Sequence, residues 1–141
     1  MNYQAIGDQL PQVVKQVTQE TIRGYAHAAG DFNPVHLDEK FAAQTHFGGI
    51  VAHGMLGLAY VSEMLTQAYG EDWLRTGQLQ VRFRAPMYPG DTLTTFGVVE
   101  RAETEENILY LECLIGGKTQ QGIEAIVGGA RVRCVLNHEG G

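Results

Sequence analysis

The chain has few cysteines, no excess of positive charge and no long hydrophobic run. Its 141 residues include 2 cysteines and 4 prolines, and the net charge is −6. A net negative charge disfavours nonspecific binding to nucleic acid or to anionic membranes, because both need a basic surface. No stretch reaches the roughly 18 apolar residues of a membrane span, and the N-terminus lacks the pattern of a signal peptide.

The length and the cysteines bound the organisation of the chain. The length suits a single domain at residues 1–141, with a core at roughly residues 12–136. Cys113 and Cys134 lie inside apolar, strand-like runs. This placement indicates buried thiols in a reducing cytoplasm rather than a disulfide.

Two hydrophobic periodicities divide the chain. Helical spacing dominates the first half, where Thr18 is expected to cap a helix ending at Gly30, and Asp38 a short helix at 39–44 with Phe41 facing inward. Residues 51–68 are apolar on nearly every side, which predicts a buried helix. The other expected elements are a strand at 12–17, a loop at 69–77, strands at 79–84, 93–100, 108–115 and 123–136, and turns at 86–91, 101–107 and 116–118. Together they predict an α+β fold in which an antiparallel sheet wraps around one helix, with a bulge or close backbone approach at Gly128-Gly129.

The most informative segment is Ala29-Gly30-Asp31-Phe32-Asn33-Pro34-Val35-His36. Gly30 permits backbone angles closed to other residues, while the proline fixes its own φ and moves the preceding residue out of the α region. We therefore expect a bent connection rather than a regular helix, on which Asp31 and His36 converge. A carboxylate and an imidazole aimed at one point suit proton transfer at neutral pH.

This segment, preceded by Tyr25, resembles the signature of the MaoC-like (R)-specific enoyl-CoA hydratases. The likeness continues through residues 47–55, which resemble the start of that family's central helix, and through the turn and strand at 89–93; it spans roughly residues 15–135. The resemblance implies a hot-dog fold and the reversible syn addition of water to trans-2-enoyl-CoA, giving (R)-3-hydroxyacyl-CoA. It also implies that no metal or redox cofactor is needed, and a homodimer whose sheets join side by side.

Hydration of an unsaturated thioester needs a base for water and a partner for the thioester oxygen as enolate character develops. We expect Asp31 and His36 to hold one water, with Asp31 as the base and His36 as the group that orients the water and shuttles the proton. Which of the two protonates C2 is open. Gly54, at the start of the buried helix, is expected to donate its N–H to the thioester oxygen, a role that the resemblance also implies.

Three further residues complete the expected site. Asn33 is expected to brace the loop, His53 to brace the helix N-terminus or take a direct part in catalysis, and Ser62 to face the acyl pocket or the catalytic pair. Asp31, His36 and His53 are also the donor types of a two-histidine, one-carboxylate metal site. Neither His-x-x-x-His nor cysteine spacing supports that alternative.

Other functions remain open at this stage. The chain is alternatively a dehydratase acting on acyl carrier protein, a thioesterase on the same fold, or a non-catalytic acyl-CoA-binding module, and Gly-Asp-x-Asn-Pro by itself is also ordinary turn chemistry. Coenzyme A carries phosphates, so a local basic cluster must attract it to an acidic chain. The candidate clusters are Lys118 with Arg131 and Arg133, or Arg82 with Arg84.

Overall fold

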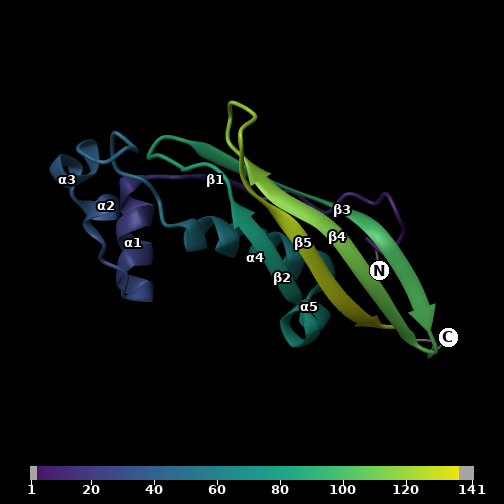
Figure 1. Cartoon of the computed structure of the whole chain (residues 1–141). Coiled ribbons are helices and arrows are strands. Elements are labelled where there is room, and N and C mark those ends of the chain that lie inside the picture. Colours follow the sequence, from purple (N-terminus) through teal and green to yellow (C-terminus); the bar gives the residue numbers. More distant parts are fainter. Residues whose placement is uncertain (1–2, 137–141) are drawn as a thin grey trace.

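A curved antiparallel sheet holds a long helix against its concave face (Figure 1). The structure is a computed structural model, and it describes residues 3–136. Its elements are β1 (Val14–Gln16), α1 (Gln19–Ala29), α2 (Pro34–Leu37), α3 (Glu39–Ala43), α4 (Gly54–Tyr69), α5 (Glu71–Thr76), β2 (Gln78–Phe83), β3 (Thr92–Glu105), β4 (Ile108–Lys118) and β5 (Glu124–Val135). The expected α+β architecture is thus confirmed.

The strands lie in the order β1-β3-β4-β5-β2, and every neighbouring pair is antiparallel. The register shifts between Val99 and Arg101 in β3, and between Gly117 and Lys118 in β4. Such bulges bend a strand and increase its twist, which lets the sheet curve around α4. The two edges differ, because β1 has 3 residues and β2 has 6.

Glycines in β4 and β5 allow neighbouring strands to lie close together. A Cβ added to Gly128 would lie 2.0 Å from the main-chain oxygen of Gln80, and one on Gly116 would lie 2.3 Å from a main-chain oxygen of β5. The close backbone approach expected at Gly128 is confirmed. The turn expected at 116–118 is wrong: these residues belong to β4 and pair with β3 and β5, and the chain reverses at 119–123.

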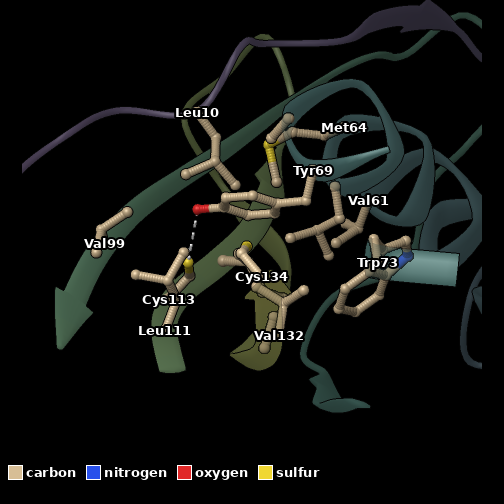
Figure 2. Packing of buried hydrophobic residues seen from close by; sticks show 14 of the residues in the cluster. Leu10, Val61, Met64, Tyr69, Trp73, Val99, Leu111, Cys113, Val132 and Cys134 are labelled. Atoms are coloured by element: carbon tan, nitrogen blue, oxygen red, sulfur yellow. Dashed lines mark hydrogen bonds between the residues drawn. The ribbon is translucent and has the colours of Figure 1, made fainter. Parts of the chain in front are cut away.

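The main core lies between α4 and the sheet. Figure 2 shows Tyr69 at its centre, where the phenol hydroxyl donates to the main-chain oxygen of Tyr3 at 2.8 Å and lies 3.5 Å from Cys113 Sγ. Cys113 and Cys134 are buried free thiols, as expected. Burial raises the pKa of the Cys113 thiol, and that of Cys134 to about 12. No helix among residues 3–136 is both long and apolar enough to cross a bilayer.

A second apolar cluster joins α1, the first turns of α4 and the start of β3. Its buried members are Val17, Ile22, Ala42, Ile50, Ala52, Leu56, Tyr60, Met87, Leu93 and Ala125. Both ends of α1 are capped as expected: Thr18 Oγ1 accepts from the N–H of Thr21 at 3.0 Å, and Gly30 adopts a left-handed conformation with φ of 72°. The cluster therefore fixes the loop after α1 in relation to the N-terminus of α4.

Several local expectations are wrong. The expected loop at 69–77 contains α5, whose Trp73 is buried. The expected turn at 101–107 is mostly strand, because the β3–β4 hairpin reverses within two residues, the first of which, Glu106, has a φ of 57°. Phe41 is 47% exposed, because α3 is a single short turn that buries only its Ala42 face. Residues 51–53 precede α4 and are not helical, and His53 is extended.

Candidate active site

The loop that carries Asp31 leads directly into a short helix that carries His36. Asn33 caps α2, its Oδ1 accepting from the N–H of Val35 at 3.1 Å, and Pro34 occupies the first helical position. Proline is favoured there because its fixed φ suits the helix and its missing N–H would be unpaired in any case. The expected non-helical connection is therefore confined to residues 30–33, and the bracing role expected of Asn33 agrees with this contact.

A backbone contact sets the orientation of the His36 ring. Its Nδ1 lies 2.8 Å from the main-chain oxygen of Val51. A carbonyl oxygen only accepts, so Nδ1 carries the hydrogen, and in the neutral ring Nε2 holds the free lone pair. His36 thus presents a proton-accepting nitrogen on the side away from Val51.

His53 packs between the two segments of the site. It is buried, its ring stacks on that of His36 with centroids 3.8 Å apart, and it also contacts Tyr25 at 4.9 Å. Its Nε2 donates to the main-chain oxygen of Asp31 at 3.1 Å, and its Nδ1 has no hydrogen-bond partner within residues 3–136. His53 therefore connects the N-terminus of α4 to the Asp31 loop, which is more than the helix bracing expected of it.

Asp31 and His36 lie close together, and His53 joins them. One polar atom from each lies within 4.8 Å of the others, and Asp31 lies on the exposed side of the group. These three side chains are also the donor types of a two-histidine, one-carboxylate metal site. The two imidazole planes are only 25° apart and stacked, so their lone pairs, which lie in the ring planes, do not converge on one ion. The geometry suits proton transfer better than chelation.

The N-terminus of α4 lies beside this group. Gly54 is its first residue, and no side chain caps it. Within the described part of the chain, the N–H of Gly54 has no recorded hydrogen-bond acceptor. A Cβ on Gly54 would lie 3.0 Å from the Phe83 ring. The glycine therefore leaves a free N–H, with the positive end of the helix dipole, in a confined space.

A mostly apolar cavity of about 390 Å³ is lined by His36 and Gly54, whereas Asp31 and His53 do not line it. Its other walls include Val51, Phe83, Met87 and Ile126. Phe83, Met87 and Ile126 have no role in the expected site, because a hydrophobic pattern does not say which residues border a cavity. The cavity is large enough for a short acyl chain with its thioester.

Ser62 lies apart from this arrangement. Its Oγ accepts from Trp73 Nε1 at 3.2 Å, a contact between α4 and α5, and Ser62 does not line the cavity. Of the residues expected at the site, the structure thus brings Asp31, His36, His53 and Gly54 together, places Asn33 as a brace in the same loop, and leaves Ser62 outside.

Comparison with known proteins finds a matching family. The family model of the MaoC like domain matches residues 2–112. The chain belongs to this family. A MaoC-like relative, the (R)-specific enoyl-CoA hydratase of Aeromonas caviae, is 32% identical over 126 residues, which cover 89% of this chain and 92% of that one. The 3-hydroxybutyryl-CoA dehydratase of Methylorubrum extorquens is 33% identical over 116 residues, covering 80% and 73%.

Solved structures of MaoC-like proteins share the fold. The unliganded R-hydratase of Pseudomonas aeruginosa superposes with a TM-score of 0.80 at 25% identity, covering 94% of this chain and 83% of that chain. The sheet wrapped around α4 is therefore a hot-dog fold, as the resemblance implied.

Proposed function

We propose that this MaoC-like protein is an (R)-specific enoyl-CoA hydratase, a hydro-lyase that adds water reversibly to trans-2-enoyl-CoA and gives (R)-3-hydroxyacyl-CoA. The observation that carries the proposal is the convergence of Asp31 and His36, within 4.8 Å, beside the free N–H of Gly54. The identity of the relatives supports the substrate and the stereochemistry, since they are named for hydration or dehydration of CoA thioesters.

The proposed chemistry uses two protein groups on one side of the double bond. A water held between Asp31 and the free Nε2 of His36 gives up a proton to the Asp31 carboxylate as its oxygen bonds to C3. Negative charge then develops on the thioester oxygen, where the N–H of Gly54 and the dipole of α4 stabilise it, an effect worth about 3–4 kcal/mol in other enzymes. A proton from one of the pair then reaches C2 on the same face. Every step uses this chain's own residues, so we propose that no cofactor takes part.

The assembly and location are part of the proposal. β2 is a sheet edge of 6 residues and ends in Phe83, which is 52% exposed beside the cavity. An open edge of this kind is a template for pairing. We propose a homodimer in which two β2 strands pair and cover Phe83. Two neighbouring, unpaired buried thiols favour a reducing compartment, and we propose the cytoplasm.

One assay tests the function. Purified protein is mixed with trans-2-butenoyl-CoA, and the loss of the conjugated enoyl thioester absorbance is followed, with chiral analysis of the product. We expect hydration to the (R)-3-hydroxy thioester. Release of free thiol would instead indicate a thioesterase, tight binding without turnover a binding module, and turnover of the carrier-protein thioester alone a dehydratase of fatty-acid synthesis.

A further inference from the structure

The chain is acidic, yet its proposed substrate carries phosphates, so the position of free cations matters. Several cations face carboxylates: Lys15 Nζ lies 3.2 Å from Glu63, and Arg131 Nε lies 3.7 Å from Glu112. Arg131, one of the candidates for phosphate attraction, is therefore partly neutralised. Neither Arg84 nor Lys118 has a recorded ion pair within residues 3–136.

Arg84 and Lys118 line one hollow, although the sequence suggests two separate basic clusters for them. The hollow measures about 380 Å³ and is lined by Arg84, Ala85, Lys118, Gly122, Ile123 and Glu124. Arg84 and Ala85 also line the cavity that contains His36 and Gly54. The cavity and the hollow are therefore adjacent, and Arg84 forms part of the wall of each.

Contacts within the fold fix the backbone at Arg84 and the side chain of Lys118. The N–H of Arg84 donates to the main-chain oxygen of Ala125 at 2.8 Å, which fixes the chain just after β2. Lys118 ends β4, and its Nζ lies 5.2 Å from the centre of the Phe96 ring, within cation–π range. Little conformational freedom of the backbone is lost when an anion binds between positions fixed in this way.

We propose that Arg84 and Lys118 bind the phosphate groups of the coenzyme A carrier while its thioester occupies the adjacent cavity. The inference rests on the proposed function. The chemistry of the pair fits, because a guanidinium grips phosphate oxygens through two N–H groups and an ammonium acts as a point charge. A hollow with two cations suits a compact phosphate group, whereas the acidic surface of a carrier protein would need cations spread over a wider face.

The test compares two thioesters that differ in their phosphates. Trans-2-butenoyl-CoA carries them, and trans-2-butenoyl-pantetheine keeps the arm and lacks them. For Arg84→Gln and Lys118→Gln we expect KM for the CoA substrate to rise about three- to tenfold with kcat retained, and kcat/KM for the pantetheine substrate to stay at the wild-type value. Glu124→Gln removes the carboxylate of the hollow and should lower KM for the CoA substrate alone.

Arg133→Gln is the matched control, because it removes an exposed cation of β5 that does not line either space. Activity on the pantetheine substrate doubles as the check that each variant is folded. If the Arg84 and Lys118 variants keep the wild-type KM for the CoA substrate, or lose only the turnover of a carrier-protein substrate, this inference is wrong and the hydratase proposal stands. If the wild type hydrates neither thioester, the proposed function itself fails.

Discussion

Asp31 is the side chain on which the proposed chemistry depends most directly. Asp31→Asn keeps the shape of the side chain and its Oδ1, which accepts from the N–H of Asn33 at 3.3 Å, but removes the base. We expect kcat for hydration to fall about 10²- to 10⁴-fold with an unchanged melting temperature. Asp38→Asn is the control, because asparagine caps a helix as well as aspartate does and the α3 cap lies outside the proposed machinery. Near-normal activity of Asp31→Asn would refute the assignment.

We propose that His53 supports catalysis through the residues that it contacts. His53→Phe keeps a ring to stack on His36 and Tyr25, and removes the hydrogen bond to the Asp31 main chain. Because one such bond is worth about 1 kcal/mol, we expect kcat to fall about fivefold through a less well held Asp31 loop, while KM changes little. A merely structural role would lower the melting temperature and leave kcat of the folded fraction intact, so both are measured.

At the residue scale, the proximity of Asp31 and His36 is easier to predict from the sequence than the contacts that surround them. Asp31 and His36 share a short segment, so local rules suffice to bring them together. The hydroxyl of Ser62 contacts Trp73, and Trp73 lies on α5, a helix that the sequence pattern does not predict. The free Nε2 of His36 depends on the main chain of Val51, a contact between residues 15 positions apart. Such contacts depend on how separate elements pack, so no single segment of the sequence predicts them.

The elements differ in how much room their glycines have. Gly24 lies inside α1 with nothing within 4 Å of an added Cβ, whereas a Cβ on Gly128 would meet the Gln80 main chain at 2.0 Å. We expect Gly24→Ala to raise the free energy of unfolding by about 0.5–1 kcal/mol, since alanine is the better helix former. Gly128→Ala should lower it by about 3 kcal/mol or more, because strand β2 must move. Urea denaturation of both variants measures the difference, and equal effects would contradict the strand spacing described here.

The limits of prediction at the element scale have a common cause. Helix α1 is predictable, because Thr18 and Gly30 are strong local caps. The turn predicted at 116–118 is wrong, because its glycines allow the close contact between strands and do not reverse the chain. Glycine carries both meanings in a sequence, and only the neighbouring strand decides between them.

At the scale of the whole molecule, the proposed dimer depends on the β2 edge. Near the centre of two self-paired antiparallel strands, each residue faces its own copy or an adjacent residue. Gln80→Glu therefore places like charges across the pair, and we expect the dimer dissociation constant to rise about fivefold. Gln67→Glu, which adds the same charge on the exposed side of α4, is the control. Light scattering over a dilution series measures both, and a stable wild-type monomer would contradict the dimer.

The stability of the whole molecule should decline at alkaline pH. Burial raises the pKa of Cys134 from its ordinary value of 9.0 to about 12. Above pH 9 the unfolded chain releases this proton while the folded chain retains it, so unfolding becomes more favourable until about pH 12. Each such thiol lowers the free energy of unfolding by up to about 1.4 kcal/mol per pH unit in this window. Cys134→Ala should flatten the decline between pH 9 and 12, and an unchanged slope would contradict it.

The two thiols of the central core have a practical consequence. They are the only cysteines of the sequence, and their exposed fractions are 3% and 0%. A sulfhydryl reagent added to the native protein therefore has no target until the layer between α4 and the sheet separates. The rate of alkylation would report how often this layer opens, without any label introduced by mutation.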